Sequence, residues 1–299
     1  MPSRSQLRHC VEYAAARVLL AALAWMPRAG AEWLARMCLH LLALFVPRLR
    51  RTARRNLELA LPELTAPERR RIVRGVFRSL ARMAVVFARL PRLDRENISE
   101  WIRYDGFEHF RQALARGRGV LFAAAHLGNW ELSAFAHALL AGPMDIVVRP
   151  LDNPLLDRLV ERYRTLSGNR IIPKREAARA VLKALRANRA VGILIDQNAA
   201  PEEGVFVDFF GRKACAGAAF TRLAARSGAT VIPGFALWSD TERRYVLRFY
   251  PPIEMTGDVR HDTQRLHSFL ESVIRQHPDQ WLWIHRRWKT RPPGEPPLY

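Results

Sequence analysis

From residue 106 onward the sequence alternates between short apolar runs and segments whose apolar residues recur at helical spacing. This alternation is typical of a parallel sheet that helices bury on both faces. The runs that predict strands are 120–125, 146–149, 170–173 and 190–195. Two further runs, 230–237 and 245–250, flank a polar turn and predict an antiparallel pair, and 261–276 predicts a helix. The pattern therefore predicts an α/β fold with a mostly parallel, mixed sheet covered by helices on both faces.

His126 and Glu131 stand where the first of these runs meets a helix. His126 follows the strand 120–125, and Asn129, followed by apolar residues at helical spacing, starts the helix. In open α/β sheets, ligands bind at the carboxyl ends of the strands. A neutral imidazole accepts a proton from a hydroxyl group, while a carboxylate on its other nitrogen fixes the tautomer. The spacing alone is weak evidence, because such a pair is more often structural.

Arginines follow the second predicted strand. Arg149 ends the strand 146–149, and Arg164 lies in the stretch after it. Forked guanidinium groups suit phosphate and carboxylate groups, so these arginines are candidates for binding a ligand. The alternative is pairing with acidic side chains nearby in the sequence, which are Asp152, Asp157 and Glu161.

Asp196 ends the apolar strand 190–195. If the strands are parallel, it reaches the same sheet edge as His126. An ionisable residue there is costly unless it is hydrogen-bonded, so we expect Asp196 and Gln197 to line the site and Asp196 to orient Arg164. The alternative is that Asp196 caps a helix or shapes a turn.

The formal net charge of +20 indicates an anionic partner: nucleic acid, an anionic membrane surface or an acidic protein. The sequence has no zinc-finger spacing, aromatic RNP strand or basic zipper, which argues against nucleic acid. It also has no Gly-x-Gly-x-x-Gly, Walker or Gly-x-Ser-x-Gly motif, so neither nucleotide binding nor a serine acyl-enzyme is supported. Its cysteines, Cys10, Cys38 and Cys215, are far apart, so we expect no disulfide framework or metal site.

Residues 11–26 and 33–46 are apolar-rich stretches near the amino terminus. Both contain charged side chains, so neither offers the roughly 18 uninterrupted apolar residues of a clear spanning helix. We expect an interfacial or marginally inserted anchor, with the basic run 47–55 against anionic headgroups on the cytoplasmic side. The alternative is a helical hairpin packed on the protein. We therefore divide the chain into a membrane-associating helical segment, 1–60, and an α/β domain, 61–299.

Thr65 and Glu68 form a capping-box pattern, and the apolar spacing after them predicts a helix that ends near Leu90. A second face of this helix carries an arginine stripe, which consists of Arg71, Arg74, Arg78 and Arg82. We expect this stripe to meet the membrane or an acidic protein partner. The alternative is a solvated face.

Five blocks of the sequence together resemble one family. They are His126-Leu-Gly-Asn-Trp-Glu131, Arg149-Pro-Leu-Asp-Asn-Pro-Leu-Leu-Asp157, Asp196-Gln-Asn198, Phe209-Phe-Gly211 and Gln280-Trp-Leu-Trp-Ile-His-Arg-Arg-Trp-Lys-Thr-Arg291. Jointly they resemble the lipid A biosynthesis acyltransferases, the late lauroyl and myristoyl transferases, within the wider His-x4-Asp/Glu lysophospholipid and glycerolipid acyltransferases. The resemblance covers residues 106–299 in blocks and the amino-terminal segment more loosely.

The resemblance implies acyl transfer from an acyl carrier protein thioester to a hydroxyl of a lipid A precursor, at the cytoplasmic face of a bacterial inner membrane. His126 would act as general base, and Glu131 would orient it and balance its charge. The expected substrate-binding and oxyanion residues are Arg149, Arg164, Asp196, Gln197 and Asn129. The expected partners are the carrier protein, the lipid acceptor and the anionic membrane surface, with no nucleic acid, cofactor, metal ion or acyl-enzyme.

Two alternatives stay open. The first is a lysophospholipid or other glycolipid acyltransferase that uses acyl-CoA. The second is a non-catalytic basic protein that binds membranes or nucleic acid, which would leave the arrangement of His126, Glu131 and Asp196 unexplained. His285 is the only serious competitor to His126 among the other histidines, and we interpret it as structural.

Overall fold

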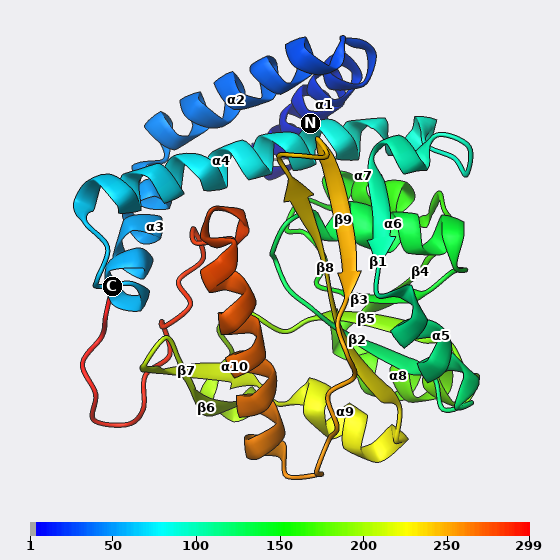
Figure 1. Ribbon diagram of the computed structural model, residues 1–299. Helices are drawn as coiled ribbons and strands as arrows, with labels where there is room; N and C mark the ends of the chain where they lie inside the picture. Colours follow the sequence, from blue (N-terminus) through cyan, green and yellow to red (C-terminus); the bar gives the residue numbers. More distant parts are fainter. Residues whose placement is uncertain (1–3) are drawn as a thin grey trace.

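The computed structural model describes residues 4–299, which form a seven-stranded mixed sheet and a separate two-stranded one (Figure 1). The order in the large sheet is β1-β9-β8-β2-β5-β3-β4, and neighbouring strands are parallel except β8 and β9. Its strands are β1 (Ile102–Asp105), β2 (Val120–Ala124), β3 (Asp145–Val148), β4 (Arg170–Pro173), β5 (Ala190–Leu194), β8 (Thr230–Ser239) and β9 (Arg244–Phe249). The predicted mostly parallel sheet with one antiparallel pair is confirmed.

Alternate residues of β2 belong to two hydrophobic cores. Phe122 packs in a cluster with residues of α5 (Phe107–Ala115) and α6 (Trp130–Leu140), whereas Leu121 packs on the opposite face of the sheet. The helices on the Leu121 face are α8 (Ala177–Arg186), α9 (Ala219–Ser227) and α10 (Val259–Gln276). Apolar burial on both faces explains why β2 is an unbroken apolar run rather than an alternating one.

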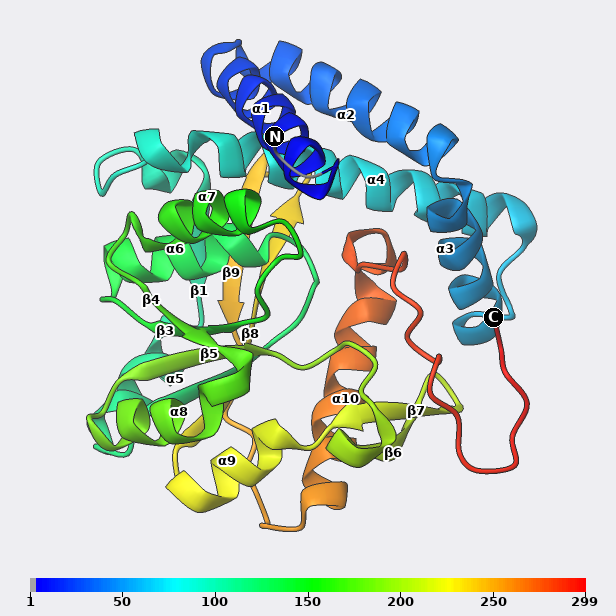
Figure 2. The same cartoon turned by 180° about the vertical axis from the view of Figure 1, so that it is seen from behind.

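Four helices precede the sheet. They are α1 (Arg4–Trp25), α2 (Arg28–Phe45), α3 (Pro47–Ala60) and α4 (Ala66–Arg89). The predicted capping box is present, because the Thr65 side chain accepts from the Glu68 backbone N–H and the Glu68 carboxylate accepts from the Thr65 N–H. α4 lies between the pair α1 and α2 and the rest of the fold (Figures 1 and 2). It contacts α1 and α2 through Ala81 and Val85, and α5 and α6 share a core with its Val86.

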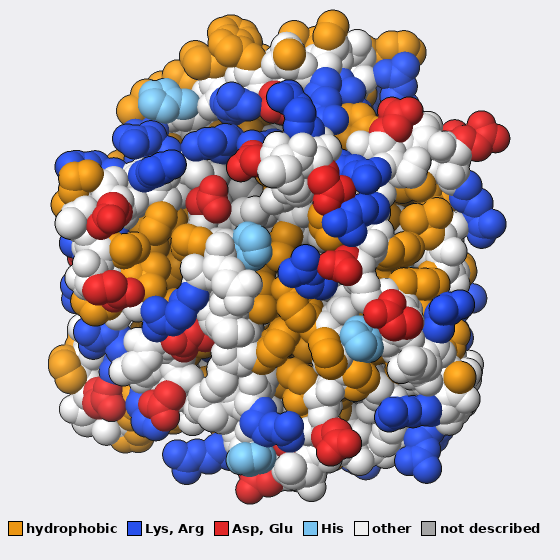
Figure 3. Space-filling view, viewed as in Figure 1, with side chains coloured by type: hydrophobic (Ala, Val, Ile, Leu, Met, Phe, Trp, Pro, Cys, Tyr) orange, Lys and Arg blue, Asp and Glu red, His pale blue; other side chains and the backbone are white. Residues whose placement is uncertain are grey.

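The two amino-terminal apolar stretches are helices that have one packed side and one open side. Leu23 and Ala31 are buried against α4. The outer side exposes large apolar side chains, including Trp25 at 76 % and Phe45 at 83 %. Figure 3 shows hydrophobic side chains over α1 and α2, with Lys and Arg side chains just below them over α4. No single helix within residues 4–299 is long and apolar enough to cross a bilayer, whereas α2 and α3 together meet the test of length and composition but are bent by 90°.

A hairpin of β6 (Gly204–Phe209) and β7 (Arg212–Gly217) stands apart from the sheet and was not predicted. Phe210 and Gly211 form its two-residue turn, and both have positive φ, as a tight hairpin turn of this kind requires. Phe210 is nonetheless buried, against Trp281 and Trp283.

Short connections complete the chain. α7 (Pro154–Thr165) lies beside α6 and α1. Single turns of 3-10 helix are η1 (Leu90–Arg92), η2 (Ile98–Glu100), η3 (Lys174–Glu176), η4 (Pro201–Glu203) and η5 (Pro278–Gln280). The carboxyl-terminal segment returns to α3, where the side-chain amide of Asn56 donates to the carbonyl oxygens of Trp283 and His285.

Candidate active site

His126 and Asp196 meet at the carboxyl edge of the sheet. β2 and β5 are parallel neighbours in register, with Ala124 opposite Leu194, so the residues that follow them emerge side by side. His126 Nδ1 lies 2.9 Å from Asp196 Oδ1, and the His126 backbone N–H donates to Asp196 Oδ2 at 3.0 Å. The prediction that both residues share one sheet edge is confirmed.

Glu131 does not contact His126 by a hydrogen bond, and in this respect the predicted pairing was wrong. Its carboxylate accepts two hydrogen bonds from Arg164, from Nε at 2.9 Å and from Nη2 at 2.5 Å. The physical reason is that Glu131 lies in the first turn of α6, beside α7, which carries Arg164 in its last turn. Asp196, expected to orient Arg164, instead holds His126.

The environment of Asp196 keeps it ionised. Its side chain is 2 % exposed, and burial alone would raise the carboxyl pKa. The charge and hydrogen bonds of His126, and the Trp281 indole N–H at 2.8 Å, outweigh burial and lower the pKa of Asp196 to about 2. An ionised carboxylate only accepts hydrogen bonds, so the neutral imidazole of His126 carries its proton on Nδ1.

The other ring nitrogen of His126 is therefore the basic one. Burial would lower the pKa of His126, but the charge and hydrogen bond of Asp196 and the more remote charge of Glu131 together raise it above the ordinary value. The Gln197 amide nitrogen lies 3.4 Å from Nε2, and Trp130 packs edge-on against the ring at a centroid distance of 4.9 Å. A group reaching Nε2 meets a lone pair that can accept a proton.

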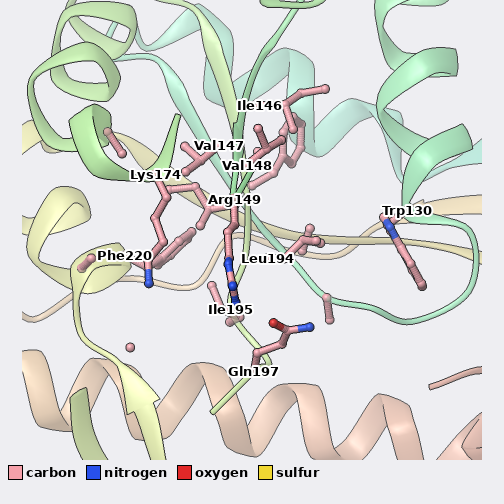
Figure 4. A pocket seen from close by; sticks show the side chains of 18 of the residues that line it. Trp130, Ile146, Val147, Val148, Arg149, Lys174, Leu194, Ile195, Gln197 and Phe220 are labelled. Carbon is pink, nitrogen blue, oxygen red and sulfur yellow. The ribbon is translucent and has the colours of Figure 1, made fainter. Parts of the chain in front are cut away.

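A cavity of about 1050 Å³ opens at this edge, and His126, Glu131 and Arg164 line it. Its walls reach both faces of the sheet: Phe122 and Phe249 belong to the core on the α6 side, and Phe220 to the core on the α9 side. Figure 4 shows Trp130 and Phe220 at opposite sides of this cavity, with Arg149 and Gln197 between them. Further apolar wall residues are Met144, Ile146, Val147, Leu182, Leu194, Ile195 and Leu223.

The bacterial lipid A biosynthesis acyltransferase model matches residues 1–290 of this chain. The chain belongs to that family. The lipid A biosynthesis lauroyltransferase of Escherichia coli (strain K12) is 31 % identical over 258 residues, which are 85 % of this chain and 84 % of the relative. The palmitoleoyltransferase of the same strain is 30 % identical (85 % and 83 % covered), and its myristoyltransferase is 26 % identical (84 % and 80 % covered). The resemblance seen in the sequence is therefore confirmed, and the protein is an acyltransferase.

The remaining predicted residues occupy different places in this acyltransferase. Arg149 lines the cavity, but its side chain is 81 % exposed and 3.7 Å from Asp152. Gln197 also lines the cavity. Asn129 does not, because its buried side chain caps α6 by accepting from the Leu132 N–H at 3.0 Å. The structure thus gives Asn129 a capping position instead of a place in the expected substrate-binding set.

His285 has a structural position in this acyltransferase, as the sequence led us to expect. Its Nε2 accepts the backbone N–H of Asn198 at 3.0 Å, and burial lowers its pKa to about 4. The imidazole is therefore neutral at physiological pH, and its basic nitrogen already accepts a hydrogen bond from the backbone.

Trp281 and Trp130 are site residues that sequence reasoning missed. Trp281 donates to Asp196 from 85 positions further along the chain, which no local spacing reveals. Trp130 has a signal, because it precedes Glu131 within the His-x4-Glu block and begins α6.

The arginine stripe of α4, which we expected to meet the membrane or an acidic protein partner, is exposed at three of its four positions. Arg71, Arg74 and Arg78 are exposed. Arg82 is only 14 % exposed, because its guanidinium group stacks over Trp238 at 4.4 Å and lies 3.4 Å from Asp240.

Proposed function

We propose that this acyltransferase moves a fatty acyl chain from an acyl carrier protein thioester to a hydroxyl group of a lipid A precursor, with His126 as general base. The observation that carries the proposal is the contact of His126 Nδ1 with an ionised, buried Asp196, which makes Nε2 the basic nitrogen of a residue that lines the large cavity. Membership of the lipid A biosynthesis acyltransferase family supports the acyl-transfer part of this proposal. The carrier-protein donor and the roles of the residues are our proposal.

In the proposed mechanism, Nε2 of His126 takes the proton of the acceptor hydroxyl as its oxygen attacks the thioester carbonyl carbon. Asp196 stabilises the imidazolium that forms. The tetrahedral intermediate then collapses: the carbon–sulfur bond breaks, and the imidazolium returns the proton to the leaving thiolate. The new ester and the free carrier thiol account for all atoms, with His126 neutral again.

We propose that Arg164 stabilises the oxyanion of the tetrahedral intermediate by its charge and its N–H donors. Two of its five N–H donors bind Glu131, which leaves three donors on a cation that lines the cavity. Glu131 fixes the plane of the guanidinium group through the bidentate contact. In this scheme Glu131 acts on the oxyanion through Arg164, and its charge also favours the imidazolium of His126.

The apolar outer sides of α1 and α2 are proposed to bind the cytoplasmic face of the bacterial inner membrane. Isolated apolar side chains are common on protein surfaces, but here large ones follow the length of two helices: Leu7, Val11, Val18, Trp25, Trp33, Leu41, Leu44 and Phe45. α3 follows directly after α2, and its exposed arginines Arg48, Arg51 and Arg54 suit anionic headgroups.

The test is mass spectrometry of lipid products after incubation with acyl carrier protein thioesters of several chain lengths. His126→Ala should lower turnover by about a hundred- to ten-thousand-fold, the usual loss on removal of a general base, and His285→Ala should lower it far less. The same assay with acyl-CoA donors and lysophospholipid acceptors covers the alternative acyltransferase reaction. Normal turnover by a folded His126→Ala protein would overturn the mechanism.

A further inference from the structure

α8 and α9 present a surface of cations, and these two helices contain no acidic residue. α8 contains no Asp or Glu, and Arg179, Lys183 and Arg186 are exposed on its outer side. α9 likewise contains no acidic residue and exposes Arg222 and Arg226. Among the side chains that the structure describes, which are those of residues 4–299 except Glu176, none forms an ion pair with these cations or with the exposed Arg175 that precedes α8. We call this set the α8–α9 basic surface: Arg175, Arg179, Lys183, Arg186, Arg222 and Arg226.

This concentration of charge opposes the stability of the two helices. Arg179 and Lys183 stand four residues apart on α8, as do Arg222 and Arg226 on α9, and like charges at this spacing repel. The negative end of each helix dipole stabilises cations in the last turn, which are Lys183, Arg186 and Arg226. Arg179 and Arg222 lie before the last turn and gain no such stabilisation. Elsewhere the chain pairs many of its arginines with carboxylates, as with Arg164 and Glu131. An unpaired basic surface of this size is suited to an anionic partner.

The α8–α9 basic surface also borders the cavity that reaches His126. α8 and α9 pack against each other. Arg175, Arg222 and Arg226 line the cavity together with the apolar Leu182 and Phe220 of the same two helices. Lys174 lies there as well, but it is paired with Glu203 at 2.9 Å. The wall formed by the two helices therefore combines apolar residues with arginines, and the acidic residues that line the cavity near it, Glu202 and Glu203, belong to η4 and not to α8 or α9.

The position of the α8–α9 basic surface favours a protein partner over a membrane. Both ribbon views place α8 and α9 at the end of the sheet opposite α1 and α2 (Figures 1 and 2). A membrane bound by the exposed apolar sides of α1 and α2 therefore lies away from the α8–α9 basic surface. A lipid acceptor would approach from the α1 and α2 end, and a water-soluble donor from the other.

We propose that the α8–α9 basic surface docks an acidic acyl carrier domain, whose phosphopantetheine arm enters the cavity between α8 and α9 with its phosphate bound by Arg222, Arg226 and Arg175. This rests on the proposed function, and it locates the donor on α8 and α9 instead of on the α4 arginine stripe. The phosphodiester is a single anion suited to guanidinium donors, and the uncharged pantetheine matches the apolar wall beyond them. The outer cations of α8 face the carrier domain itself.

The first experiment compares two triple charge reversals of equal size, Arg179→Glu/Lys183→Glu/Arg186→Glu on α8 and Arg71→Glu/Arg74→Glu/Arg78→Glu on α4. KM is measured with acyl carrier protein and with acyl-CoA donors, using a detergent-dispersed acceptor so that membrane binding does not contribute. The α8 triple should raise KM for the carrier protein about tenfold or more and change that for acyl-CoA much less. An equal effect of both triples, or an effect of the α4 triple alone, would overturn the docking surface. A Gln triple on α8 replaces the Glu triple if circular dichroism shows that the latter is misfolded.

The second experiment isolates the phosphate. Arg222→Gln/Arg226→Gln is assayed with an acyl-4′-phosphopantetheine donor and with the matched acyl-pantetheine, which lacks the phosphate. In the variant, KM for acyl-4′-phosphopantetheine should rise about tenfold, towards the KM for acyl-pantetheine, and KM for acyl-pantetheine should not change. A raised KM for the acceptor, with both donors unaffected, would assign these arginines to a lipid phosphate and overturn the proposal.

A binding measurement keeps this inference separate from the proposed function. Fluorescence titration of labelled holo-acyl carrier protein against wild type and both triples needs no turnover. Tight binding that only the α8 triple weakens supports the docking surface even if no acyl transfer is found. Binding that is absent in the wild type, while turnover with acyl-CoA is normal, contradicts the docking surface and leaves acyl transfer intact.

Discussion

Asp196 holds His126 through two contacts, one from the imidazole Nδ1 at 2.9 Å and one from the backbone N–H at 3.0 Å, although 70 residues separate them in the chain. The pair emerges from adjacent parallel strands, β2 and β5. The backbone contact places the carboxylate, and the ring contact sets which nitrogen of His126 is basic. The tautomer of the proposed base, His126, is thus determined by Asp196, which follows the neighbouring strand β5.

Asp196→Asn should reduce kcat by on the order of a hundred- to ten-thousand-fold with little change in fold. A side-chain amide that turns its NH₂ group towards the ring favours the tautomer with its proton on Nε2, which is unable to act as base. Steady-state kinetics and near-ultraviolet circular dichroism of the variant check this. A rate within a few-fold of wild type would mean that Asp196 has only a structural role.

The pH dependence should follow the raised pKa of His126. Below that pKa the imidazole is protonated and is not a base, so kcat/KM should fall on the acid side, with a midpoint above 6.5. Asp196→Asn removes the charge that raises the pKa and leaves burial, which lowers it, so the midpoint of the residual activity should move to lower pH. A midpoint unchanged by the substitution would indicate that another group titrates.

Glu131 and Arg164 should behave as one unit. Glu131→Gln, Arg164→Lys and the double variant form a cycle, in which we expect a coupling free energy of about 1–3 kcal/mol in kcat/KM. Arg164→Lys keeps the charge but loses the bidentate contact, so it should reduce turnover nearly as much as Glu131→Gln. Additive losses would show that the carboxylate and the guanidinium group act independently.

Membrane attachment should depend on the outer side of α1 and α2. Trp25→Glu/Phe45→Glu replaces two exposed side chains without disturbing the packing on α4, whereas deletion of residues 1–46 uncovers Ala81 and Val85. Liposome pelleting should drop strongly for the double variant, and high salt alone should extract the wild type poorly while detergent extracts it well. Wild-type protein that stays in the supernatant with anionic liposomes would favour the packed-hairpin interpretation.

The strands and helices at the site were predictable because their signals are local. The apolar run of β2 reflects burial on both faces, and Asn129 and Thr65 cap helices through residues three positions away. The β6–β7 hairpin was not predicted, because its turn residue Phe210 is bulky, buried and in the left-handed region, a conformation that its packing against tryptophans stabilises. Local rules assign such turns to Gly, Asn or Asp.

By itself, the sequence determined that the chain builds a mostly parallel α/β sheet and that His126, Asp196 and Arg164 are candidates at its carboxyl edge. It also determined the family, because the model of that family matches residues 1–290 of the sequence. Only the tertiary structure decided the pairing: Asp196 with His126, and Glu131 with Arg164. The physical reason is that hydrogen bonds depend on which strands and helices are neighbours in space, and the order β2-β5-β3 is a property of the whole sheet that no spacing in the sequence specifies.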